Sequence, residues 1–174
     1  MATGRNIQLT RQIGEHLVVT ELGRKGFIAT PFAGNVPNFD LLVANEKGFA
    51  IPVQVKAING GAWQFAITTF LNIEISNGMQ NILSRKVSPH PSLVCVLVLL
   101  RAAGTDEFFT LTFNNLQDHF ACTYKARKPP HKVESMHCAV WPKDLQKYKD
   151  WSVLLSALNE TEEGLTGDKD YRTG

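Results

Sequence analysis

Cysteine, surplus charge and long apolar runs are all scarce in this chain of 174 residues. The 3 cysteines, Cys95, Cys122 and Cys138, show no paired spacing, so we expect free thiols in a reducing compartment rather than a disulfide framework. The longest apolar run, residues 93–100, is far shorter than the ~20 residues of a membrane-spanning helix. The first residues contain no apolar stretch of the kind that marks a secretion signal. These absences predict a cytoplasmic protein without a membrane-spanning segment.

The charge of the chain is close to balanced, because 18 Lys and Arg face 16 Asp and Glu and leave a net charge of +2. A charge of this size neither requires nor forbids a nucleic-acid partner, so any DNA-binding surface must be a local patch. The hydrophobic fraction of 44% is that of an ordinary globular protein, and no internal repeat is present. We predict a single domain over residues 10–158, a flexible N-terminus over 1–9 and a disordered polar tail over 159–174.

The first predicted element is a helix over residues 10–24. Thr10 suits its N-cap, apolar residues follow at helical spacing, and the cations Arg24 and Lys25 precede Gly26 at its end.

A β-hairpin is predicted next. Two apolar runs, 39–44 and 49–57, flank the turn Asn45-Glu46-Lys47-Gly48, in which the glycine suits the left-handed position after a type I turn. This turn places Asp40 opposite Gln54, with Lys56 two residues further along the same face. Pro52 requires a bulge or a position without a ladder hydrogen bond.

The remaining elements follow from apolar patterns and turn residues. Further strands are expected at 27–32, 63–67, 93–100, 108–112 and 136–141. Further helices are expected around Gly78–Arg85, from Asn114 or Asn115 to Tyr124, and from Pro142 to Leu158. The order predicts an α/β fold with a mixed central sheet flanked by helices.

Asp40, Gln54 and Lys56 are the residues most in need of a functional explanation. They lie at the edges of two runs that otherwise have the composition of buried strands. Burying an aspartate and a lysine is costly unless they are paired or bind a metal. We therefore interpret them as a divalent-metal site.

An acid at the start of one strand, followed by Gln-x-Lys on the next, resembles the motif of the PD-(D/E)XK nuclease superfamily. The matching residues are Asp40, Gln54 and Lys56, and Glu15 in the first helix is similar to the helix-borne acid of restriction-endonuclease-like and Holliday-junction-resolvase-like members. The resemblance covers residues 10–100. It implies an αβββαβ core, hydrolysis of DNA phosphodiester bonds, and a homodimer where two strands are cut.

The resemblance also implies roles for the residues. Asp40 would be the main ligand of Mg²⁺ or Mn²⁺, assisted by the side-chain oxygen of Gln54 and the backbone carbonyl of Val55. Lys56 would orient or deprotonate the attacking water and neutralise the phosphate. Gln54 stands where a second acid is commoner, and Glu15 would restore the missing negative charge.

Each residue also has a plain structural interpretation. Asp40 suits the start of a strand, Gln54 a solvated strand face, and Lys56 an exposed strand edge. Glu15 suits an exposed helix face. The alternative function is a catalytically inactive module with this fold that binds DNA or a protein partner.

Two further groups of residues have side chains that can bind ligands. The histidines and cysteines lack the spacing of zinc ligands, so we expect no structural zinc. Basic residues that suit contacts with DNA phosphates are Lys125, Arg127, Lys128 and Lys132 in one proline-broken loop, together with Arg24 and Lys25. A solvated loop is the alternative for the first four.

Overall fold

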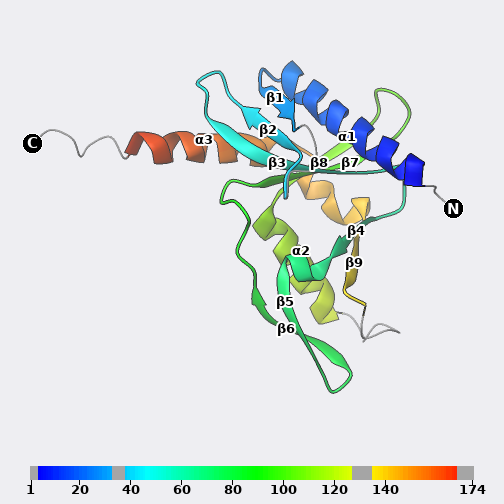
Figure 1. The fold of residues 1–174 in the computed structure, drawn as a ribbon. Helices are drawn as coiled ribbons and strands as arrows, with labels where there is room; N and C mark the ends of the chain where they lie inside the picture. The colour runs from blue at the N-terminus through cyan, green and yellow to red at the C-terminus, as the bar shows by residue number, and fades with distance from the viewer. Residues whose placement is uncertain (1–3, 33–37, 127–134, 168–174) are drawn as a thin grey trace, which may run out of the picture.

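The computed structural model describes residues 4–32, 38–126 and 135–167. In chain order (Figure 1) the elements are α1 (Gly4–Arg24), β1 (Ile28–Pro31), β2 (Leu41–Ala44), β3 (Ala50–Ile58), β4 (Trp63–Ala66), η1 (Ile67–Thr69), β5 (Leu71–Ser76), β6 (Met79–Arg85), β7 (Val94–Leu99), β8 (Glu107–Thr112), α2 (Phe113–Ala126), β9 (His137–Val140), η2 (Pro142–Tyr148) and α3 (Ser152–Gly167).

A five-stranded mixed sheet forms the centre, in the order β1-β2-β3-β7-β8. Only β3 and β7 are parallel; the other neighbours are antiparallel. One face packs against α1 and α3 through residues such as Val18 and Leu154, and the other packs against α2 and η2 through residues such as Phe120 and Leu145. The predicted mixed α/β sheet flanked by helices is therefore confirmed (Figure 1).

Strand β7 is buried on both faces, as the apolar run at 93–100 predicts. All of its residues from Val94 to Leu99 are buried, and they alternate between the two hydrophobic clusters. Its partner β8 confirms the strand predicted at 108–112.

The β2–β3 hairpin has the predicted register, from Leu41↔Val53 to Ala44↔Ala50, and the ladder passes Pro52 without a shift. The Asn45 side chain fixes the turn, because its Oδ1 accepts hydrogen bonds from the N–H groups of Lys47 and Phe49, both at 3.0 Å. Gly48 has a φ of 85°, the left-handed conformation expected there.

Helix α1 lies very close to β3 at Gly14. A Cβ on this residue would stand 2.4 Å from the Cβ of Ala57, closer than two carbon atoms can approach without displacement. The missing side chain therefore lets the helix settle directly on the strand that carries Gln54 and Lys56.

The prediction of a helix around Gly78–Arg85 is wrong. The chain forms the β5–β6 hairpin instead, and its turn residues Asn77 and Gly78 have φ values of 52° and 69°. An Asn-Gly pair favours this kind of two-residue turn. The connection from β3 to β7, which the αβββαβ pattern expects to contain a helix, is built from β4, η1, β5 and β6.

The predicted helix start at Thr10 is also wrong. Helix α1 begins at Gly4, so residues 4–9 of the predicted flexible N-terminus are helical. Thr10 lies inside the helix and donates its hydroxyl proton to the Asn6 carbonyl at 2.8 Å, a bond that threonine makes readily within helices.

Two later helices differ from prediction at their ends. Helix α2 is capped by Thr112, not by Asn114 or Asn115, because Thr112 and Asn115 exchange side-chain to backbone hydrogen bonds at 3.0 Å. The helix predicted from Pro142 to Leu158 is divided into η2 and α3, since Asp150 Oδ1 accepts from the Ser152 N–H and begins a new helix. Helix α3 continues to Gly167, so residues 159–167 of the predicted disordered tail are helical; 168–174 lie outside the described residues.

Within the described ranges, none of the helices combines the length and apolar character that crossing a lipid bilayer requires.

Candidate functional site

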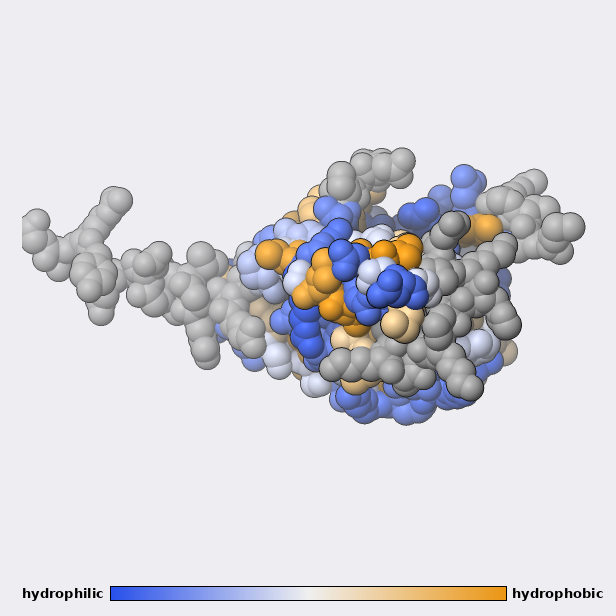
Figure 2. Space-filling model, turned by 90° about the horizontal axis from the view of Figure 1, so that it is seen from below, coloured by the Kyte–Doolittle hydropathy of each residue, from blue (hydrophilic) through white to orange (hydrophobic). Residues whose placement is uncertain are grey.

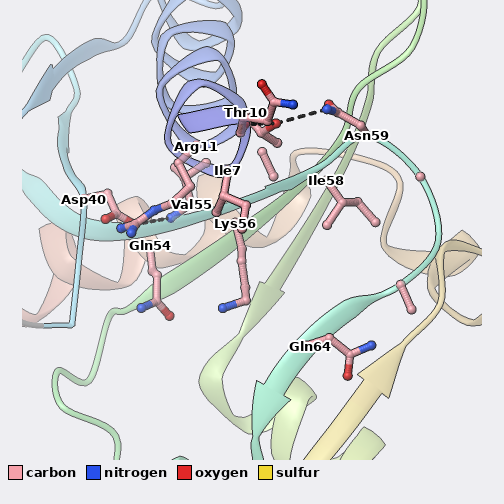
Figure 3. Close-up of a pocket in the computed structure, with 14 residues that line it drawn as sticks. Ile7, Thr10, Arg11, Asp40, Gln54, Val55, Lys56, Ile58, Asn59 and Gln64 are labelled. Carbon is pink, nitrogen blue, oxygen red and sulfur yellow. Dashed lines mark hydrogen bonds between the residues drawn. The ribbon is translucent and has the colours of Figure 1, made fainter. Parts of the chain in front are cut away.

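The predicted site residues lie where one edge of β3 is open. Pairing with β2 stops at Leu41↔Val53, whereas pairing with β7 continues from Val53 to Ile58. Among the described residues, the last part of β3 therefore has a strand neighbour on one side only. A pocket of about 870 Å³ lies along this edge beside α1 (Figure 3), lined by Asn6, Ile7, Thr10, Arg11, Asp40, Gln54, Val55, Lys56, Ala57, Ile58, Asn59, Gly60, Ala62 and Gln64.

Asp40 is fixed by the backbone of the open edge. Its Oδ2 accepts a hydrogen bond from the Val55 N–H at 2.7 Å, and its own N–H donates to the Val53 carbonyl at 2.9 Å. The Ile58 carbonyl faces β7, because it accepts from the Leu100 N–H at 2.8 Å. Since successive strand residues direct their backbone groups to opposite sides, the Val55 carbonyl points to the open edge, where Asp40 lies.

Gln54 and Lys56 lie two residues apart on β3 and project from the same face of the strand (Figure 3). The Gln54 Oε1 accepts a hydrogen bond from the Cys95 Sγ of β7 at 3.9 Å. Burial, and then the charge of Asp40, raise the pKa of the Cys95 thiol to about 12, so the sulfur keeps the proton that it donates. The amide of Gln54 is therefore held in place from the neighbouring strand.

Lys56 is held over an aromatic ring. Its Nζ lies 5.0 Å from the centroid of the Phe65 ring, and its backbone carbonyl accepts from the Trp63 Nε1 at 2.8 Å. Loss of contact with water lowers the pKa of the ammonium, and the positive charge of Arg11 lowers it further, while Asp40 opposes the change.

Glu15 lies on α1, close to Asp40 but outside the lining of the pocket. Partial burial raises the pKa of its carboxyl group, and the negative charge of Asp40 adds to that rise; Arg11 and His16 act in the opposite direction. The two predicted acids are thus near enough to repel each other.

This donor set fits a hard divalent cation with few protein ligands. Two carboxylates, the Gln54 amide and the Val55 carbonyl supply oxygen, which is the ligand type that magnesium prefers, and magnesium commonly keeps several waters. A cation between Asp40 and Glu15 would also reverse the repulsion that raises the Glu15 pKa. The described residues contain no cluster of three acidic, histidine or cysteine side chains able to hold a metal, so a bound ion would depend on the amide and carbonyl as well.

Arg11 is the pocket residue that sequence reasoning missed. It lines the pocket one helical turn before Glu15 and points from α1 toward β3 on the side of Asp40 and Val55 (Figure 3). Arg11 and Glu15 both lie within the predicted helix over 10–24 and are four residues apart. This spacing places them on one face of the helix, and it is the signal that could have found Arg11.

Of the predicted DNA-contacting cations, Arg24 and Lys25 do not line the pocket. Arg24 pairs with Glu21 at 2.8 Å, and the Lys25 Nζ lies 5.7 Å from the centroid of the Trp151 ring. Lys125 belongs to the last turn of α2. Arg127, Lys128 and Lys132 lie outside the described residues.

No protein-family model and no curated protein matches the chain. Among solved structures, the chain is similar to a bacterial homing endonuclease, I-Ssp6803I, with a TM-score of 0.43 and 12% sequence identity over 93% of this chain and 97% of that one. A likeness this distant carries no argument about function, which must come from the site itself.

Proposed function

We propose that the protein is a divalent-metal-dependent nuclease that hydrolyses DNA phosphodiester bonds. The observation that supports this best is the meeting of Asp40, Gln54 and Lys56 in one pocket, with Arg11 in the lining and Glu15 beside it. An acid, an amide and a lysine gathered at an open strand edge match the site that the PD-(D/E)XK resemblance implies.

Asp40, Glu15, the Gln54 Oε1 and the Val55 carbonyl would hold Mg²⁺ or Mn²⁺, which when bound stabilises charge on a phosphate and acidifies a coordinated water. Asp40 is oriented for this role by the Val55 N–H, and Gln54 by the Cys95 thiol. These bonds fix both oxygen donors before a ligand arrives, which is the preorganisation that makes electrostatic catalysis effective.

Lys56 would act on the water and the phosphate. Its ammonium carries a lowered pKa, which brings proton exchange closer to neutral pH, and in its charged form it neutralises a phosphate oxygen. Lys56 therefore holds or gives up a proton at Nζ beside the reacting phosphate.

The test is cleavage of linear, nicked and branched DNA by purified protein in Mg²⁺ or Mn²⁺. Lys56→Ala should reduce the rate by about a hundredfold or more, the size of effect seen when a charge-stabilising group is removed. Lys143→Ala is the matched control, because it removes an exposed lysine from η2, away from the pocket. Absence of cleavage of every substrate, or equal cleavage by the Lys56 variant and the wild type, refutes the catalytic proposal.

A binding module without catalysis is the second candidate, and Gln54 is the observation that favours it. A neutral amide that already accepts from Cys95 supplies less charge to a cation than the commoner acid would. Calorimetric titration with Mn²⁺ separates the two functions. Mn²⁺ binding that requires Asp40 supports the nuclease, whereas DNA binding by a protein that takes up no Mn²⁺ supports the module.

A further inference from the structure

Two cations line the pocket without a salt bridge to any described residue. Arg11 and Lys56 both line it, and neither takes part in any ion pair formed among residues 4–32, 38–126 and 135–167. Arg24, Arg85 and Arg101 provide a contrast, because each pairs with a carboxylate.

Like charges are also brought together on both sides of the site. Arg11 and Lys56 repel each other, as do Asp40 and Glu15. Close packing of α1 on β3 at Gly14 holds these groups near one another. An anion between the two cations relieves one repulsion, and a metal ion between the two acids relieves the other.

We infer that Arg11 and Lys56 form a phosphate-binding subsite that takes a nucleic-acid phosphate without the help of a metal. This inference rests on the proposed function, since it specifies how the same pocket would recognise its substrate. The planar guanidinium of Arg11 offers two parallel N–H donors to phosphate oxygens, and the Lys56 ammonium adds a compact positive charge. Both residues keep solvent-exposed surface, although the Lys56 ammonium is partly withdrawn from water.

The rest of the pocket suits a nucleotide better than a free phosphate. Its volume of about 870 Å³ is several times what a phosphate fills, and its lining includes apolar Ile7 and Ile58. The Asn59 Nδ2 donates to the Thr10 Oγ1 at 3.0 Å, which ties that end of β3 to α1. A sugar or base attached to the phosphate would lie against this wall.

Binding in the absence of metal tests the subsite directly. A single-stranded oligonucleotide with a 3′ fluorophore is titrated with protein in EDTA at several salt concentrations, and anisotropy is recorded. Arg11→Gln should weaken binding about tenfold to a hundredfold and reduce the slope of log affinity against log salt by about 0.7. Arg11→Lys should recover part of the affinity.

Arg101→Gln is the control, because it removes the same charge from an exposed residue outside the pocket lining. Its affinity should change less than about twofold, as for a solvent-exposed ion pair. Inorganic phosphate should compete with the oligonucleotide for the wild-type protein and only weakly for Arg11→Gln. If it does not compete, the pocket binds the phosphate only as part of a nucleotide, and oligonucleotide binding should still be weakened by Arg11→Gln.

Mn²⁺ calorimetry separates ligand binding from a structural role. Arg11→Gln should bind Mn²⁺ at least as tightly as the wild type, because a positive charge near Asp40 and Glu15 has been removed. Equal weakening of Mn²⁺ and oligonucleotide binding, or an oligonucleotide affinity unchanged by Arg11→Gln, overturns the inference. If Arg11→Gln weakens metal-free binding but the wild-type protein cleaves no DNA, the subsite stands and the nuclease proposal is refuted. If the wild type cleaves DNA and Arg11→Gln changes neither cleavage nor binding, the nuclease proposal stands and the subsite is refuted.

Discussion

Two hairpins of the molecule, β2–β3 and β5–β6, have similar turn residues and differ in burial. Both turns use an asparagine and a glycine with positive φ, Gly48 in β2–β3 and Gly78 in β5–β6. The first hairpin lies inside the main sheet, and four of its side chains are fully buried: Leu41, Val43, Ile51 and Val53. In the described part of the chain, the two strands of the second hairpin pair with each other and with no further strand, and Ile75, Met79 and Leu83 are exposed.

The base and the tip of the β5–β6 hairpin also differ from each other. Its base is clamped by buried Gln117, whose Nε2 donates to the carbonyls of Phe70 and Lys86 at 2.8 and 2.7 Å. Its tip projects from the body, and the face seen from that side mixes apolar and hydrophilic side chains (Figures 1 and 2). A hairpin alone is marginally stable in water, so β5–β6 depends on the contacts at its base. The candidate site lies on the other hairpin, β2–β3, which packing in the main sheet holds in place.

The largest expected difference between the hairpins is in metal binding and activity. Asp40→Asn keeps an acceptor for the Val55 N–H but removes the charge, so Mn²⁺ binding by calorimetry should be lost and DNA cleavage reduced about a hundredfold or more. Glu74→Gln makes the same change at an exposed position of β5 and should alter neither. Equal metal affinity in wild type and Asp40→Asn contradicts the assignment of Asp40 as the main ligand.

Core truncation should distinguish the hairpins by stability. Ile51→Ala creates a cavity at a fully buried position and should lower the free energy of unfolding by about 2–5 kcal/mol. Leu83→Ala, at a side chain that is 62% exposed, should change it by less than about 0.5 kcal/mol. Urea denaturation measures both. A comparable loss at Leu83 would mean that the β5–β6 hairpin is packed against something in solution.

An atom added at the contact between α1 and β3 should lower the stability of the protein. Gly14→Ala puts a methyl group against Ala57 and should destabilise the protein by about 1–3 kcal/mol. Gly23→Ala adds the same methyl group where no atom lies within 4 Å, so it should stabilise by about 0.5–1 kcal/mol through helix propensity. Thermal unfolding compares them. The double variant Gly14→Ala with Ala57→Gly should recover most of the loss if this contact is the cause.

The smallest difference is expected at the two turns. Replacing Gly48 or Gly78 by alanine forces a side chain into a left-handed conformation at a cost of about 1–2 kcal/mol. At Gly48 the loss should appear in global unfolding, because β2–β3 is part of the main sheet. At Gly78 it should be confined to faster amide hydrogen exchange in β5 and β6. Exchange that increases across the whole sheet in Gly78→Ala would show that the two hairpins are not independent.

The part of the site that the sequence predicts depends on local signals in the β2–β3 hairpin. The turn from Asn45 to Gly48 determines its own register, and that register places Asp40 near Gln54 and Lys56 without knowledge of the rest of the fold. Runs such as 93–100 predict buried strands for the same reason, since a strand covered on both faces needs apolar residues throughout.

The missed features depend on contacts between distant parts of the chain. Arg11 enters the pocket only because Gly14 lets α1 approach Ala57, and nothing near residue 11 announces that contact. The β5–β6 hairpin is an exception, because it has a local signal that the helix predicted around Gly78–Arg85 neglects. Strand β5 alternates apolar and polar residues from Leu71 to Ser76, and Asn77-Gly78 suits a two-residue turn. The parallel pairing of β3 with β7 has no local signal at all.

That parallel pairing has a consequence for the order of folding. The first β3–β7 pair joins Val53 to Val94, and the residues between them form four other elements. Closing so long a loop loses entropy before any contact is gained, so non-local parallel pairs form slowly, whereas the β2–β3 hairpin can form within microseconds. Residues 54–58 have β7 as their strand neighbour, and we expect the pocket to assemble in the slow phase of folding, after its own hairpin. A newly made chain would acquire its structure in stages, with the candidate site completed near the end.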